Sequence, residues 1–82
     1  MTQRQMGVRI TKRREELNMT TTRLAELVGI SQAQISRLEN GRQGVRSAVL
    51  FRLSKALDVP PCYFVMGDKE WETYQDSAKK KR

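Results

Sequence analysis

The chain has 82 residues, of which 38% are hydrophobic and 30% are charged. This length and balance are typical of one small folded domain, and they leave little room for a deep catalytic cleft beside the core. The formal net charge of +7 favours an acidic partner, and nucleic acid is the commonest partner of a strongly basic domain.

The inventory of reactive side chains argues against an enzyme. The chain contains no histidine and only one cysteine, Cys62, so zinc sites and Cys/His catalysis are excluded. It also lacks a P-loop and a GxGxxG motif. We therefore expect no catalytic residue, no metal ligand and no cofactor.

Hydropathy and cysteine content predict a cytoplasmic protein. No apolar stretch approaches the roughly 20 residues that a membrane helix needs, and the N-terminus lacks the apolar core of a signal peptide. A single cysteine cannot form an internal disulfide, which agrees with a reducing compartment. We expect no membrane partner, and we expect association with the nucleoid when the protein is bound to DNA.

Apolar residues recur every three or four positions, and this period predicts an all-α fold. The first helix is expected over residues 6–17. The second is expected over residues 21–28, with Thr20 as its N-cap and Gly29 as its left-handed C-terminal cap. The side chains expected to face the core from these two helices are Met6, Ile10, Leu17, Leu24, Leu27 and Val28.

A third helix is expected over residues 32–38, with Ser31 as its N-cap. The Asn-Gly pair that follows ends it, and residues 42–46 form a basic loop.

A fourth helix is expected over residues 48–57, with Ser47 as its cap, and two consecutive prolines stop it. Residues 62–66 are expected to form a short fifth helix. Around residues 71–74 we expect one more helical turn or a contact with a partner.

The spacing of small and apolar residues across the second and third expected helices predicts a helix-turn-helix. Ala25 is small where two helices joined by a short turn cross closely, and Gly29 can adopt the positive φ that a tight turn demands. Larger apolar side chains fill the wedge between the helices, namely Leu24, Val28, Ile30, Ile35 and Leu38. The alternative is a purely structural helical hairpin, because such hairpins also carry Ala and Gly at these places.

This geometry leaves one face of the third expected helix open, and that face is polar but carries little charge. The residues on it are Gln32, Ala33, Gln34, Ser36 and Arg37. A Gln side chain can bond an adenine edge, an Arg side chain can bond guanine, and a methyl group such as that of Ala33 can contact thymine. We expect these residues to contact bases in the major groove.

The segment TTTRLAELVGISQAQISRLENGR, residues 20–42, resembles the Cro and phage-repressor family of helix-turn-helix regulators, often called XRE-like. The resemblance extends over about residues 6–66. It implies a compact, lambda-repressor-like bundle of five helices that binds operator DNA as a dimer. It also implies contacts with DNA phosphates from Thr21, Thr22, Asn40, Arg42, Gln43 and Arg46.

This sequence departs from the family pattern at the start of the second helix. Members often carry Gln at this position, where it touches a phosphate and braces the recognition helix. Here the residue is Thr21, which can still bond a phosphate but is expected to be too short to brace Gln32. The departure affects how the outermost base is recognised and leaves the fold unaffected.

A buried ion pair between Arg14 and Glu39 is also implied by the resemblance. Arg14 lies on the same helical face as Ile10 and Leu17, so it should point partly inward and need a partner. The alternative is a solvated Arg14. The loop at residues 42–46 likewise has two interpretations, a phosphate clamp or a solvated connection.

The apolar run after the two prolines predicts a homodimer interface, because it exceeds what a small monomer exposes. The residues expected in the interface are Pro61, Tyr63, Phe64, Met66 and Trp71. The alternative is a helix that only caps the core. The basic run at residues 79–82 is either a solubilising end or a weak contact with DNA.

We interpret residues 1–5 as a mobile N-terminus, residues 6–67 as the helix-turn-helix domain, and residues 68–82 as a partly disordered extension. The function expected is a homodimeric, sequence-specific regulator of transcription, most often a repressor, bound to double-stranded DNA at a pseudo-palindromic operator. One alternative is an antitoxin-type interaction module with a protein partner at its C-terminal segment. The other alternative is a non-specific condenser of nucleic acid.

Overall fold

The computed structural model describes residues 2–80, with side chains up to Ser77, and every regular element in this part of the chain is helical. The elements in chain order are α1 (Gln3–Glu16), α2 (Thr21–Val28), α3 (Gln32–Glu39), α4 (Ser47–Ala56), the 3₁₀ turn η1 (Pro61–Val65) and α5 (Asp68–Lys80). The predicted all-α class with a helix-turn-helix is confirmed. No helix among these residues combines the length and the apolar character needed to cross a bilayer.

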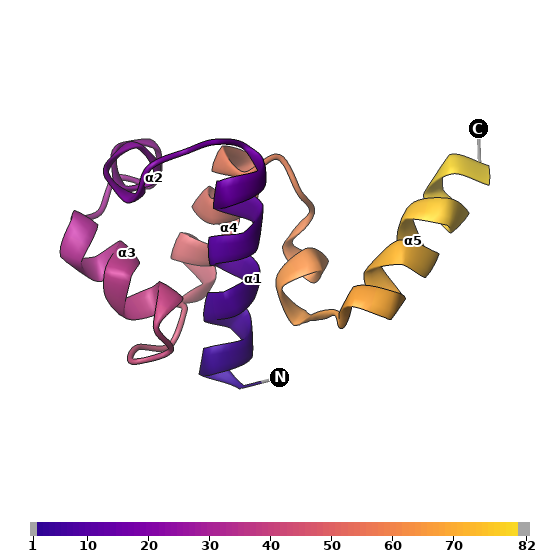
Figure 1. Ribbon diagram of the computed structural model, residues 1–82, viewed down its shortest axis with the longest axis horizontal. Helices are drawn as coiled ribbons and strands as arrows, with labels where there is room; N and C mark the ends of the chain where they lie inside the picture. Colours follow the sequence, from indigo (N-terminus) through magenta and orange to yellow (C-terminus); the bar gives the residue numbers. More distant parts are fainter. Residues whose placement is uncertain (1, 81–82) are drawn as a thin grey trace.

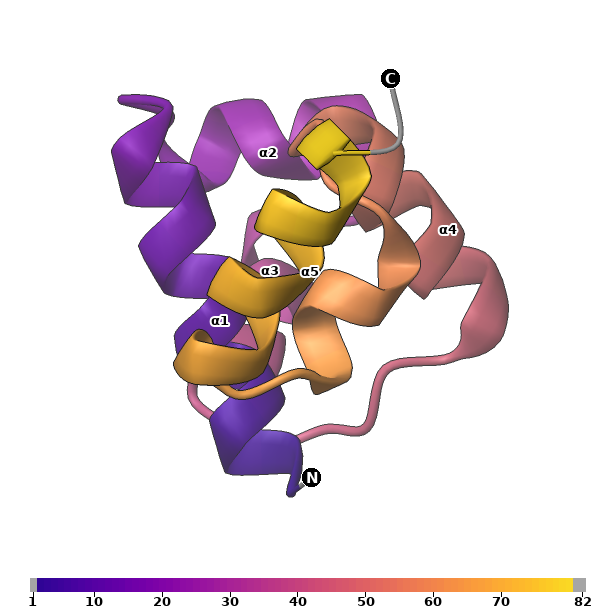
Figure 2. The ribbon, with the colours of Figure 1, turned by 90° about the vertical axis from the view of Figure 1, so that its right-hand side faces the viewer.

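The body of the domain is organised around α1. Figure 1 shows α1 at the centre, with α2 and α3 on one side and η1 and α5 on the other. In the view turned by 90°, α5 lies in front of the body, on the side away from α3 (Figure 2). Helices α3 and α5 therefore lie at opposite ends of the molecule.

The core is formed by one buried side-chain cluster from α1 to η1. Its members are Ile10, Leu24, Ala25, Val28, Ile35, Leu38, Leu53, Leu57, Val59, Tyr63 and Phe64. Leu17 and Leu27, predicted to face inward, are 37% and 44% exposed. Leu17 follows the last residue of α1, and Leu27 lies roughly 100° around α2 from the middle of its buried stripe.

Helix α1 starts at Gln3, three residues earlier than predicted, so the predicted start of the first helix at residue 6 is wrong. The Thr2 hydroxyl accepts a hydrogen bond from the Gln5 backbone N–H at 3.1 Å, and the Gln5 side chain accepts one from the Thr2 N–H at 2.8 Å. This reciprocal capping box satisfies two donors at the helix start. Ser47 is also not a cap, because Arg46 holds the extended cap conformation and Ser47 is the first residue of α4.

The chain after the two prolines is more regular than predicted. The expected short helix is a 3₁₀ turn, and 13 helical residues follow where one turn was expected. Asp68 and Glu70 lie in the first turn of α5, where negative charge complements the helix dipole. The basic run at residues 79–82 lies outside the side chains that the structure describes.

Arg9 anchors α5 to the body, although the sequence pattern gives it no role. Its side chain is 7% exposed, its Nε donates to the Tyr63 carbonyl oxygen at 3.1 Å, and its guanidinium lies 4.1 Å from the Tyr63 ring centroid. It also forms an ion pair with Asp68. Lys12 and Arg9 together lower the pKa of the Asp68 carboxyl, and Trp71 packs edge-on against Tyr63 at 4.9 Å.

At Gly7 the backbone of α1 lies directly against the backbone of α3. A Cβ built at this position would lie 2.5 Å from the Leu38 carbonyl oxygen and 2.8 Å from the Glu39 carbonyl carbon. Backbone atoms cannot move aside as a flexible side chain can. The contact between α1 and α3 therefore tolerates no side chain at position 7. Because an isolated glycine inside a helical pattern lowers helix stability, its presence indicates a packing requirement of this kind.

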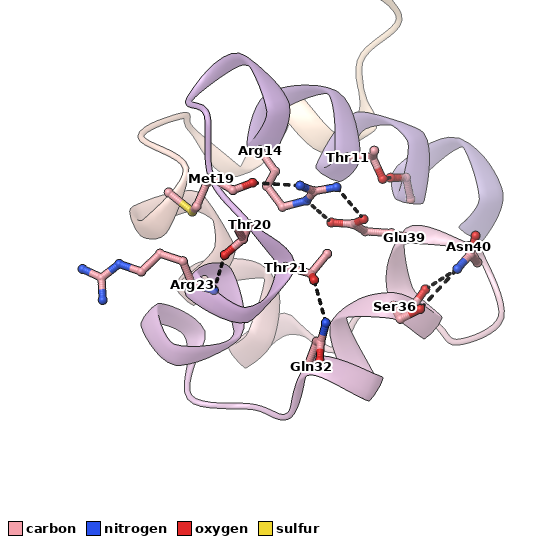
Figure 3. A network of polar contacts seen from close by, with 11 residues as sticks. Thr11, Arg14, Met19, Thr20, Thr21, Arg23, Gln32, Ser36, Glu39 and Asn40 are labelled. Atoms are coloured by element: carbon pink, nitrogen blue, oxygen red, sulfur yellow. Dashed lines mark hydrogen bonds and ion pairs between the residues drawn. The ribbon is translucent and has the colours of Figure 1, made fainter.

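The ion pair between Arg14 and Glu39 ties the same two helices together further along α1. Arg14 Nε and Nη2 donate to the two Glu39 carboxylate oxygens at 2.7 and 3.2 Å. Arg14 Nη1 donates to the Met19 carbonyl oxygen at 2.8 Å (Figure 3). The two side chains are 14% and 9% exposed, and the hydrogen bond to Glu39 raises the pKa of Arg14. The predicted pair is therefore present and partly buried, and Arg14 is not solvated.

Removing the Glu39 charge should destabilise the fold. We expect Glu39→Gln to lower the free energy of unfolding by about 3 kcal/mol, because Arg14 would keep its charge in a site with little water. Urea denaturation at neutral pH measures this directly. The matched control is Glu26→Gln, which breaks the exposed pair with Arg23 and should cost no more than about 0.5 kcal/mol. Equal effects of the two substitutions would contradict a structural role for the Arg14 pair.

Adding one methyl group at Gly7 should also destabilise the fold. Alanine is the better helix former by about 1 kcal/mol, yet the clash with the α3 backbone should outweigh this, for a net loss of about 1–3 kcal/mol in Gly7→Ala. The control is Gly67→Ala, whose Cβ would meet only the end of the Glu70 side chain at 3.4 Å. A Gly7→Ala protein with an unchanged or higher denaturation midpoint would show that the helices can separate there.

Candidate nucleic-acid interface

The turn between α2 and α3 aims the third helix away from the core. Gly29 has a φ of 80° and a ψ of 32°, and its N–H donates to the Ala25 carbonyl oxygen at 2.8 Å, as predicted for a left-handed cap. The Ser31 hydroxyl then accepts a hydrogen bond from the Gln34 N–H at 3.1 Å and starts α3. These two local features fix the direction in which the recognition helix leaves the turn.

One side of α3 is buried and the other is open. Ile35 and Leu38 are at most 2% exposed and hold the inner side in the core. Four of the five residues predicted to contact bases are exposed, namely Gln32, Ala33, Ser36 and Arg37. The structure thus brings these four together on one outward surface.

Gln34, the fifth predicted base contact, is placed differently. Its side chain is only partly exposed, and its Oε1 accepts hydrogen bonds from the Ser31 N–H at 2.9 Å and the Ser31 hydroxyl at 3.3 Å. This is the second half of a capping box, because Gln34 occupies the third helical position. The Gln34 oxygen is therefore engaged in holding the start of α3.

Thr21 braces Gln32, so the expectation that it is too short is wrong. Gln32 Nε2 donates to the Thr21 hydroxyl at 3.0 Å (Figure 3). The turn brings the N-termini of α2 and α3 close enough for the Gln32 side chain to span the gap by itself. Of the neighbouring candidates for phosphate contact, Thr21 is half-buried and Thr22 is exposed.

At the other end of α3, side chains are tied to each other and to the following loop. Arg37 Nε donates to Gln43 Oε1 at 3.2 Å. Asn40, the C-cap of α3, donates from Nδ2 to the Ser36 carbonyl oxygen at 2.8 Å. Arg42 and Arg46 are exposed, whereas Gln43 is half-buried.

The loop after α3 lies against the start of α1. A Cβ on Gly41, which has a φ of 70°, would lie 2.6 Å from the Arg4 Cα, and one on Gly44 would lie 3.0 Å from Gln3 Nε2. Residues 40–46 carry two arginines and no acidic residue. Because Arg14 neutralises Glu39, the end of α3 and this loop form a positive surface beside the polar face of α3.

The residues predicted for a dimer interface divide into two groups. Tyr63 and Phe64 are 2% and 0% exposed, so their assignment to an interface is wrong, because the core of the single chain already buries them. Pro61 is exposed, and Met66 and Trp71 are half-buried. Val65 and Tyr74, which the prediction did not include, are 51% and 40% exposed.

None of the side chains described forms a group of three or more His, Cys, Asp or Glu residues that could hold a metal ion.

A family model described as helix-turn-helix, HTH_3, matches residues 10–64. The uncharacterised HTH-type transcriptional regulator y4wC of Sinorhizobium fredii (strain NBRC 101917 / NGR234) is 42% identical over 59 residues, which cover 72% of this chain and 41% of that protein. Repressor protein C2 of Salmonella phage P22 is 38% identical over 63 residues, which cover 77% of this chain and 29% of that protein. The matched region is therefore less than half the length of each of these two relatives.

Solved structures of the P22 repressor share the fold closely. The solution structure of the P22 c2 repressor DNA-binding domain superposes with a TM-score of 0.76 at 37% identity, over 83% of this chain and 90% of that one. The crystal structure of the P22 c2 repressor in complex with a synthetic operator gives a TM-score of 0.72 at 38% identity, over 77% and 96% of the two chains. Because the family model matches the chain from the middle of α1 into η1 and the geometry agrees, this chain belongs to the HTH_3 helix-turn-helix family of Cro- and phage-repressor-like transcriptional regulators.

Proposed function

We propose that this chain binds double-stranded DNA in a sequence-specific manner, with α3 lying in the major groove. The observation that carries the proposal is the outward face of α3, where Gln32, Ala33, Ser36 and Arg37 are exposed together while Ile35 and Leu38 are buried. A solvated helix face of no function would more often carry Glu and Lys. The similarity to the P22 c2 repressor, which has been solved in complex with a synthetic operator, supports DNA as the partner.

Each exposed side chain on this face has a suitable base partner. Gln32 can donate to and accept from the adenine edge, Arg37 can donate twice to guanine, and the Ala33 methyl can pack against a thymine methyl. Ser36 can bond either kind of base. Hydrogen bonds of this type distinguish one base pair from another, whereas contacts with the backbone do not.

The positive loop and the start of α2 supply the sequence-independent part of the affinity. Arg42 and Arg46 are exposed next to the recognition face, and Thr22 is exposed at the start of α2. Neutralising phosphates releases counterions, so each such contact adds about 0.9 to the magnitude of the salt slope. These contacts would hold α3 in register while its side chains bind the bases.

A homodimer on a pseudo-palindromic operator is the assembly we propose. Its interface would be the apolar surface formed by Pro61, Val65, Met66, Trp71 and Tyr74, hereafter the η1–α5 surface. This surface lies on the opposite side of α1 from α3, so a two-fold axis beside it keeps the two recognition helices apart (Figure 1). Half-sites centred about 34–36 Å apart would then be bound on one face of the DNA, and repression would follow from occlusion of the polymerase.

Substitutions on α3 and in the loop should have different effects on DNA binding. With an operator selected from a random duplex pool, Gln32→Ala and Arg37→Ala should each cost about 1–3 kcal/mol at one base pair and relax the preference there. Arg42→Ala should weaken binding to all sequences alike and reduce the salt slope by about 0.9. Binding titrations on operators with single base-pair changes, at several salt concentrations, measure both effects. Uniform losses for all three variants would contradict base recognition by α3.

The dimer should depend on the η1–α5 surface. We expect the protein to elute as a dimer in size-exclusion chromatography with light scattering, and Val65→Asp to convert it to a monomer, because a carboxylate would be buried without a partner. The matched control is Phe51→Ser, which changes a 62% exposed apolar residue on α4 and should leave the dimer intact. Dissociation by Phe51→Ser alone would move the interface to α4. A monomeric parent protein would instead favour a different protein as the partner of this surface.

A further inference from the structure

We propose that Gln43, in the loop after α3, is a specificity-determining residue that positions Arg37 for one base. It would act without touching that base, by holding the Arg37 guanidinium in a fixed orientation. The inference rests on the proposed function, because it assumes that Arg37 contacts a base. It changes the expected role of Gln43 from a phosphate contact to a positioning residue.

The Arg37 side chain on α3 and the Gln43 side chain in the following loop are joined by one hydrogen bond. Arg37 Nε donates to Gln43 Oε1 at 3.2 Å. Arg37 is exposed, so packing against the core does not restrain its long side chain. Among the described residues, this is the only hydrogen bond that the Arg37 side chain makes.

Gln43 is itself fixed, which makes it a suitable brace. It is half-buried and lines a hollow of about 280 Å³ together with Ile30, Leu38 and Val49. The loop that carries it is held by α1, since Gly41 packs against the backbone of Arg4. The acceptor oxygen is therefore presented from a part of the loop that rests on the core.

The hydrogen bond determines which edge of the guanidinium remains available. Arginine has five N–H donors in a rigid, planar fork, and a bidentate contact with guanine uses one edge of that fork. With Nε engaged by Gln43, the edge formed by the two terminal nitrogens is free to meet the guanine acceptors. Without this bond, the side chain could present either edge or turn towards a phosphate, and the preference for guanine would weaken.

A positioning role and a phosphate contact predict different binding data. If Gln43 positions Arg37, its loss should affect only the base pair that Arg37 recognises. If Gln43 binds a phosphate, its loss should weaken all sequences alike. The two outcomes separate in one set of titrations on operators with single base-pair changes.

The experiment uses the full chain and an operator selected for the parent protein. Gln43→Ala should reduce the preference for guanine about tenfold at the base pair that is also affected by Arg37→Ala, with other positions and the salt slope unchanged. Gln43→Leu, which fills the hollow but has no acceptor, should behave in the same way. Gln43→Glu should keep the preference, because a carboxylate accepts the same hydrogen bond, although its charge will weaken binding to all sequences.

The double variant Arg37→Ala, Gln43→Ala should show no further loss of preference beyond Arg37→Ala, because the two residues act as a unit. The matched control is Arg42→Ala in the same loop, which should leave the guanine preference intact. A uniform loss of affinity in Gln43→Ala, or an unchanged preference for guanine, would overturn this inference alone. A parent protein that prefers no sequence would overturn the proposed function and this inference with it.

Discussion

The ion pair between Arg14 and Glu39 fixes the end of α3 relative to α1 at the centre of the domain. Arg14 also donates to the Met19 carbonyl oxygen, so a single guanidinium joins the end of α1, the segment leading into α2, and the end of α3. The absence of a side chain at Gly7 allows the close approach of α1 to α3 that this contact requires. With only 82 residues, the domain has a small core, and a few such contacts decide where α3 lies.

Charge is separated along the molecule in a way that suits this placement of α3. Residues 2–67 carry eleven basic and five acidic side chains, whereas residues 68–77 carry one basic and four acidic ones. The acidic segment forms most of α5, which lies on the opposite side of α1 from α3 (Figure 1). Asp68 also forms ion pairs with Arg9 and Lys12 of α1. Arg37, Arg42 and Arg46 on α3 and its loop have no acidic partner among the described residues, and their positive charge would help to orient the domain on DNA.

Local signals in the sequence predict the helix-turn-helix correctly, although they miss the cap at Thr2 and misplace the cap of α4 at Ser47. Contacts between residues far apart in the sequence are not predicted by such signals. Gly29 and Ser31 mark the bounds of the turn between α2 and α3, because a cap acts within a few residues of its own position. Arg9 meets the Tyr63 carbonyl oxygen 54 residues away and Asp68 59 residues away, and no periodicity encodes such a pairing. The apolar run at Tyr63 and Phe64 predicts a dimer surface wrongly, because such a run does not reveal which of its members are buried within the same chain. Gly7 did carry a signal, a glycine inside a helical pattern, whose meaning only the position of α3 explains.

The polar face of α3 is braced at both ends by residues outside the helix. Thr21 at the start of α2 holds Gln32, and Gln43 in the following loop holds Arg37. A side chain that is already ordered loses less conformational freedom on binding, so these braces favour affinity and selectivity together. If α3 contacts bases as proposed, its sequence would not by itself define the binding preference of this domain. Two family members with the same recognition helix could prefer different operators if their residues at the positions of Thr21 and Gln43 differ, because the same guanidinium or carboxamide would then be presented to the groove at another angle.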